Sequence, residues 1–149
     1  SGVAWNHRMR DIFIFHYFYN LYPAHRKLRY FGSALKTLLR SGIGVGLYAT
    51  PINCRAGVKY VGGPFEKCVS SNLTIIKTYL RSFGVEAIST AELTKRARNP
   101  KGPVFLDLAF QCDESDFFTP HNPTEHLRAA ARKNLAENIS MLAKAVAAK

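Results

Sequence analysis

The sequence predicts an α/β protein with a three-layer α/β/α architecture, in which helices cover both faces of a short, mainly parallel sheet. Segments with helical spacing alternate with short apolar runs along the chain. Strands that alternate with helices pair in parallel through right-handed crossovers. The length of 149 residues and the hydrophobic content of 47% fit one domain with a substantial core. These observations predict a single α/β domain over residues 1–149.

The first two predicted elements are helices. Residues 5–22 form an apolar run that is too long for a strand, and Pro23 marks its end. Residues 24–40 are predicted to form a second helix, which the pair Ser41-Gly42 ends. The apolar positions of this second helix recur at helical spacing: Leu28, Phe31, Leu35, Leu38 and Leu39.

A strand is predicted for residues 43–49, and a long loop with three glycines is predicted for residues 53–64. A loop of this length inside a compact domain is a typical place for ligand contacts. Asn53 and Arg55, at the start of the loop, are therefore candidate substrate-binding residues. An ordinary surface loop is the alternative.

The following segments continue the alternation of helix and strand. A helix is predicted over residues 68–83, and a strand over residues 85–88. Ser89, with Glu92 three residues later, is typical of the start of a short helix. A third strand is predicted over residues 104–110.

Three strands make a thin sheet, which a further strand upstream of Ser1 would complete. The chain begins without methionine, so the sequence also fits a fragment that lacks an N-terminal strand. In that case the missing N-terminal part of the same protein would be a partner of these residues.

The segment over residues 119–127 (TPHNPTEHL) predicts the start of the last helix. Asn122 suits the N-cap, Pro123 the first helical position, and Glu125 can reach back to the amide of the cap. Capping does not require His126. The apolar face predicted for this helix consists of Leu127, Ala131, Leu135, Ile139, Leu142 and Val146.

The chain is strongly basic, with 21 Lys and Arg against 10 Asp and Glu. Such an excess attracts an acidic polysaccharide or another polyanion such as nucleic acid. Much of it lies in the first forty residues, where Arg26, Lys27 and Arg29 are interleaved with aromatic residues. These three side chains are candidate polyanion-binding residues, and a solvated surface is the alternative.

Several function classes find no support in the sequence. The three cysteines show no CxxC spacing, so we expect no zinc site; Cys54 and Cys68 are either bridged or, like Cys112, free thiols. Walker and dinucleotide-binding glycine patterns are absent, and we expect no cofactor. The most apolar run, residues 12–19, is far shorter than the roughly 20 residues that span a bilayer.

His126 can serve as a general base, because imidazole changes its charge near neutral pH. His121 is a second, substrate-binding candidate. Asp113, Glu114 and Asp116 follow the third predicted strand, at the end where open α/β sheets bind ligands, so they are candidates to orient a histidine or to bind a metal. The alternative is that they bond to local backbone amides. The chain contains neither a GxSxG nor a Gly-Asp-Ser nucleophile motif.

Three segments together resemble the C-terminal half of SGNH/GDSL-type hydrolases, nearest to the DltD and alginate O-acetylation branch. They are residues 41–53 (SGIGVGLYATPIN), 71–88 (SNLTIIKTYLRSFGVEAI) and 119–139, the last with His126-Leu127 and the run LAENI. The resemblance covers about two thirds of the chain, and its motifs are short. It implies that the domain is part of a larger SGNH-like or flavodoxin-like domain, and it favours an extracytoplasmic location.

The resemblance implies that His126 is the base that activates a serine for acyl transfer. The family's aspartate would stand at Pro123, which cannot orient an imidazole, so Asp116, Asp113 or Glu125 would have to replace it. The glycine that follows His-Leu in the family is absent, and the family's serine would lie upstream of Ser1.

Two functions follow as hypotheses. The first is an SGNH-like esterase or O-acyltransferase domain that acts on carbohydrate or cell-envelope polymer, with a nucleophile outside this chain. The second is a non-catalytic basic module that binds nucleic acid or another polyanion.

Overall fold

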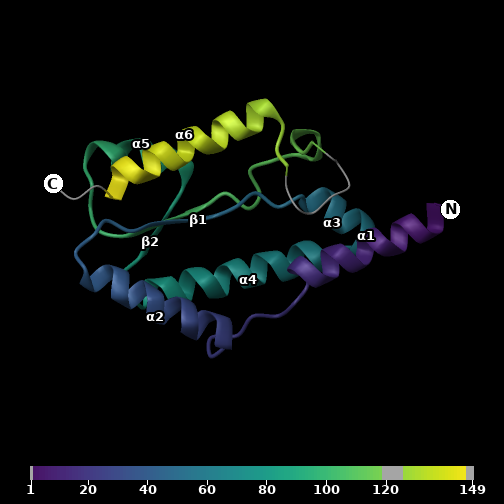
Figure 1. The fold of residues 1–149 in the computed structure, drawn as a ribbon, viewed down its shortest axis with the longest axis horizontal. Coiled ribbons are helices and arrows are strands. Elements are labelled where there is room, and N and C mark those ends of the chain that lie inside the picture. The colour runs from purple at the N-terminus through teal and green to yellow at the C-terminus, as the bar shows by residue number, and fades with distance from the viewer. Residues whose placement is uncertain (1, 119–125, 147–149) are drawn as a thin grey trace.

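The computed structural model describes residues 2–118 and 126–146, and it has the three-layer α/β/α architecture that the sequence predicts (Figure 1). A sheet lies between two helical layers, with α6 along one side and α2 and α4 along the other. The helices within the described residues are α1 (Gly2–Tyr17), α2 (Arg26–Arg40), α3 (Cys54–Val61), α4 (Pro64–Arg81), α5 (Thr90–Arg98) and α6 (Ala129–Val146). A short 3₁₀ turn, η1 (Glu114–Asp116), precedes α6.

The sheet consists of β1 (Gly46–Ala49), β2 (Glu86–Ile88) and β3 (Val104–Asp107), in the spatial order β1-β3-β2. Both pairings are parallel, with β3 between the other two strands. The chain crosses from β1 past β3 to β2 and then returns to β3. Right-handed crossovers in opposite directions place their helices on opposite faces, which accounts for α4 on one side and α5 on the other. This order differs from the end of a flavodoxin-like sheet. In the flavodoxin-like order 2-1-3-4-5 the last strand of the chain lies at the edge of the sheet, whereas here the last strand, β3, lies in the middle.

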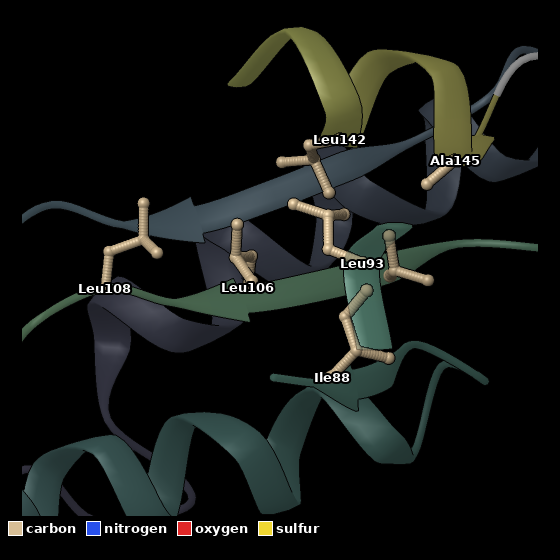
Figure 2. Close-up of a cluster of buried hydrophobic side chains, with 7 residues drawn as sticks. Ile88, Leu93, Leu106, Leu108, Leu142 and Ala145 are labelled. Atoms are coloured by element: carbon tan, nitrogen blue, oxygen red, sulfur yellow. The ribbon is translucent and has the colours of Figure 1, made fainter. Parts of the chain in front are cut away.

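The central strand carries apolar side chains to both faces. Leu106 and Leu108 lie under Leu142 and Ala145 of α6, together with Leu93 of α5 (Figure 2). On the opposite face, Phe105 packs with buried side chains of α2 and α4: Leu35 and Leu80. A parallel strand covered on both faces has to be apolar throughout, as the run VFLDLAF nearly is.

A separate apolar cluster joins α1, α3 and α4 beyond the carboxyl end of the sheet. Phe13 of α1 and Phe65 of α4 are fully buried and meet edge to face, with ring centroids 5.6 Å apart. Edge-to-face packing is a favoured arrangement of two aromatic rings. This cluster fixes α3 next to the end of β1.

The predicted helix start at Ser89 is confirmed. The Ser89 hydroxyl accepts a hydrogen bond from the Glu92 amide, and the Glu92 carboxylate accepts one from the Ser89 amide, at 3.3 and 2.8 Å. This reciprocal arrangement satisfies two backbone donors that the first turn leaves without helical partners.

The prediction for residues 5–22 is wrong at its C-terminal end, because α1 ends at Tyr17. The buried side chain of Asn72 holds the chain that follows: its carbonyl accepts from the Leu21 amide at 2.8 Å, and its amide donates to the Tyr19 carbonyl at 2.6 Å. Those two backbone groups bond to α4 instead of continuing the helix.

The predicted loop over residues 53–64 is wrong, because helix α3 occupies most of it. The Asn53 side chain accepts a hydrogen bond from the Ala56 amide at 3.2 Å and caps the helix. Gly62, with a φ of 102°, ends it, and Pro64 stands in the first turn of α4. The glycines therefore separate two helices.

The predicted start of the last helix is also wrong, because α6 begins at Ala129. Leu127 instead forms an antiparallel bridge with Phe117, so its backbone is already paired before the helix begins. Asn122, Pro123 and Glu125, the predicted capping residues, lie outside the described residues.

Among the described residues, no helix combines the length and the apolar character needed to cross a membrane.

Gly57 lies inside α3 without a positive φ, and its place is set by packing. A Cβ atom at this position would overlap the buried ring of Phe65. We expect Gly57→Ala to lower the free energy of unfolding by about 1–3 kcal/mol, because the ring has no room to move in a packed core. Urea denaturation followed by circular dichroism measures this change.

Gly63→Ala is the matched control. A Cβ atom at Gly63 meets nothing within 4 Å, and its φ of −53° and ψ of −31° suit alanine. This variant should be neutral or more stable by up to about 1 kcal/mol. Equal stability of the two variants would show that close packing does not require the glycine at position 57.

Candidate functional site

At the carboxyl ends of β1 and β3 the chain leaves the sheet in two directions, towards opposite faces. After β1 it enters α3 and α4 on one side, and after β3 it passes through η1 to α6 on the other. The two exits stay together, because the Ile52 amide donates to the Ala109 carbonyl at 2.9 Å. Open α/β sheets bind ligands in the crevice at such a switch point.

Asn53 and Arg55 lie at the β1 side of this switch point. Asn53 is buried, with 1% of its surface exposed, and its side chain caps α3 as described above. Arg55 is exposed on the first turn of the helix. Asn53 thus positions α3, whereas Arg55 can present a guanidinium group to an anionic or carbonyl-bearing ligand.

Asp113 and Asp116 lie at the β3 side, on and beside η1. The Asp116 carboxylate accepts a hydrogen bond from the Asp113 amide at 2.9 Å. One of its oxygens therefore bonds to a local backbone amide, which is the alternative that the sequence allows for these acids. Asp116 is half-buried and Asp113 is exposed. The turn packs against α3, which brings the acidic segment and the Arg55 segment side by side.

His126 is exposed on the segment that pairs with the end of this turn. The Phe118 amide donates to the His126 carbonyl, and the Arg128 amide donates to the Asp116 carbonyl at 2.7 Å. Phe117 and Leu127 form an isolated antiparallel bridge, so the backbone of Asp116 lies beside the segment that carries His126.

Phe117 and Leu127 anchor this pairing in the apolar interior. Both are buried, and they form a cluster with Ala131 of α6. The Arg128 side chain adds a further link, because its Nε donates to the Phe117 carbonyl at 3.2 Å. The backbone from His126 to Arg128 is therefore held in place, while the side chain of His126 is exposed.

The remaining predicted site residues lie elsewhere. Arg26, Lys27 and Arg29 are exposed on α2, which packs on α4. His121 lies outside the described residues. The structure thus places the segments that carry Asn53, Arg55, Asp113, Asp116 and His126 side by side, whereas the basic residues of α2 lie on a helix that packs on α4.

Lys77 is a functional candidate that the sequence did not indicate. Its ammonium group forms an ion pair of 2.5 Å with Asp107, whose other oxygen accepts from the Ala109 amide at 3.1 Å. The pair lines a pocket of about 480 Å³ at the carboxyl ends of β2 and β3, with Ser89 and Phe110 on its wall. The sequence does contain one indication of this role. Lys77 comes four residues after Leu73, so it falls on the apolar side of the predicted helix, where a lysine needs a partner.

Within the described residues, no three His, Cys, Asp or Glu side chains gather as metal ligands. Cys54, Cys68 and Cys112 are free thiols in the structure.

Comparison of the chain with protein-family models, with curated proteins and with solved structures found no match in any of the three.

Proposed function

We propose that this chain forms part of an SGNH-like esterase or O-acyltransferase that acts on carbohydrate or cell-envelope polymer. The observation that carries the proposal is that the segments with His126, Asp116 and Arg55 lie side by side near the switch point between β1 and β3. Arg55 is far from the other two residues in the sequence, and Asp116 and His126 lie on separate segments ten positions apart. Short motifs can resemble those of a family without lying close together in the fold, so the neighbourhood of these segments is support that is independent of the resemblance.

His126 acts in this proposal as the general base. It takes the proton from a serine hydroxyl, the serine oxygen attacks the ester carbonyl, and the tetrahedral intermediate expels the alcohol to leave an acyl-serine. Water or a second polymer hydroxyl then accepts the acyl group, with His126 again moving the proton. The serine is supplied from outside these 149 residues, as the resemblance implies.

Asp116 is the residue that the geometry favours for orienting His126. It is the acid next to the Phe117–Leu127 bridge, and its backbone carbonyl accepts a hydrogen bond from the segment that carries the histidine. A rotation of the imidazole towards Asp116 completes the arrangement, since catalytic hydrogen bonds often tighten only when substrate binds. Arg55, across the switch point, is available to bind the acidic or carbonyl groups of the polymer.

The first test is His126→Ala in the natural full-length protein, with hydrolysis of p-nitrophenyl acetate as the assay. We expect kcat/KM to fall about 10²–10⁴-fold, which is the usual contribution of a general base. His7→Ala is the matched control, because His7 is an exposed histidine on α1. Unchanged hydrolysis by the His126 variant would reject the assignment.

A second test distinguishes the two acids. Asp116→Asn keeps an oxygen that can accept from the Asp113 amide, so the free energy of unfolding should stay within about 0.5 kcal/mol. We expect its kcat to fall about 100-fold or more, because an amide does not stabilise the imidazolium as a carboxylate does.

Asp113→Asn is the control for this test and should change kcat by less than about threefold, since no backbone bond between described residues joins Asp113 to the His126–Arg128 segment. An equal loss in both variants, or a loss only in Asp113→Asn, would show that Asp116 is not the orienting acid.

Cys54 stands at the start of α3 in this site and is the other group to consider as a nucleophile. Burial, and then the negative charge of Glu66, raise the pKa of its thiol to about 12. The thiolate is the reactive form, and it forms only as the pH approaches that value. At pH 8 about one thiol in 10⁴ is ionised, so Cys54 is not an activated nucleophile.

We expect Cys54 in the folded chain to react with iodoacetamide at pH 8 at least about 100-fold more slowly than in the urea-unfolded chain. Mass spectrometry of the tryptic peptides measures the rate for each cysteine. The reaction rate should rise with pH, because the fraction of Cys54 that is thiolate increases as the pH approaches the raised pKa. Equal rates in the folded and unfolded chain would mean that Cys54 is an exposed, ordinary thiol.

A further inference from the structure

The surface of α2 is positively charged and has no acidic residue near it in the sequence. From residue 12 to residue 65 the chain contains no Asp or Glu. The basic residues of α2 are all exposed, and we call them the α2 basic face: Arg26, Lys27, Arg29, Lys36 and Arg40. They span about 21 Å along the helix, at 1.5 Å per residue. Their combined field attracts a negatively charged partner that is itself extended.

None of these charges is neutralised within the described parts of the chain. The ion pairs found there are Lys77 with Asp107 and Arg96 with Glu86, neither of which involves α2. An exposed carboxylate near the α2 basic face would compete with an anionic ligand. Among the described residues, no carboxylate forms an ion pair with these cations, so they are available to such a ligand.

Aromatic rings hold three of the cations in place. The Lys27 ammonium lies 4.9 Å from the ring centroid of Tyr19, and the Arg26 guanidinium lies 5.9 Å from that of Tyr30. Lys36 lies over the ring of Phe83. Cation–π contacts limit the motion of long side chains without supplying a negative charge. Ordering the cations in advance lowers the entropy that binding would otherwise cost.

The same contacts distinguish between two classes of polyanion. Single-stranded nucleic acid binds through charged grooves and through bases that stack on open aromatic faces. Here Tyr19 and Tyr30 each have a cation over one ring face, which leaves fewer open faces on which a base could stack. The surface therefore fits a polymer whose recognised groups are its anions.

We propose that the α2 basic face binds a linear acidic polysaccharide, and that this polymer is the acyl-bearing substrate of the site at β1 and β3. The second clause rests on the proposed function, and the first does not. Binding through several carboxylates along one helix would retain a polymer while its ester groups are processed one after another.

The test measures binding of polygalacturonate to the chain by isothermal titration calorimetry, with neutral dextran as the uncharged reference. The test variant combines Arg26→Gln, Lys27→Gln and Arg29→Gln. The matched control removes the same number of exposed charges from α6, with Arg132→Gln, Lys133→Gln and Lys144→Gln. Circular dichroism and thermal unfolding verify that both variants are folded.

We expect the α2 variant to bind polygalacturonate about tenfold more weakly, as the loss of three exposed ion pairs predicts, and the α6 control to change by less than about twofold. Binding should also weaken as salt is added. Equal weakening in both variants, binding of dextran, or no binding of polygalacturonate would overturn the proposal. Tighter binding of poly(dT) that depends on the same three residues would overturn it in favour of nucleic acid.

The His126→Ala variant separates this proposal from the proposed function. Its affinity for polygalacturonate should equal that of the unmodified chain, because His126 is not on α2. If activity does not depend on His126 but binding depends on the α2 basic face, the catalytic assignment fails and the binding surface stands. If activity depends on His126 but the α2 variant binds normally, the binding surface fails alone.

Discussion

The burial of β3 on both faces is the constraint on which the rest of this fold depends. Four residues of strand pair with β1 on one side and β2 on the other, so the backbone bonds of the sheet all involve β3. Leu106 faces α5 and α6, and Phe105 faces α2 and α4, so the two helical layers meet only through this strand. Apolar burial of this kind is the main source of stability in a domain of this size. It also fixes where the chain after β3 emerges, and hence the place of η1 and His126.

The elements that could be predicted from the sequence are those whose signals are local. The alternation of helices and strands, the start of α5 and the termination of α2 each depend on residues a few positions apart. Ser89 and Glu92 show this, since both members of the capping box lie within one turn. Local signals of this kind survive in the folded chain when no distant residue competes for the same backbone groups.

The failures share the opposite cause. The sequence predicts a loop around Gly57, but a glycine stands at this position because the ring of Phe65 lies against α3. Tyr19 and Leu21 continue a helical apolar pattern, yet the Asn72 side chain, some fifty positions away, takes their backbone groups. The pairing of Phe117 with Leu127 likewise replaces the predicted helix start. The candidate site was predictable as a set of residues at one edge of the sheet. The ion pair of Lys77 with Asp107 was not, because it depends on how α4 lies on the sheet.

The pairing of Phe117 with Leu127 has a consequence for how such a protein could diversify. The Phe118 amide donates to the His126 carbonyl, so these two positions are held together on the scaffold. The free energy of closing a loop changes slowly with its length, so residues can be gained or lost between these two positions at small cost. Insertions there would alter the surroundings of His126 while its backbone stays in register with Asp116. Variation in selectivity could therefore accumulate in this short stretch without requiring a new scaffold.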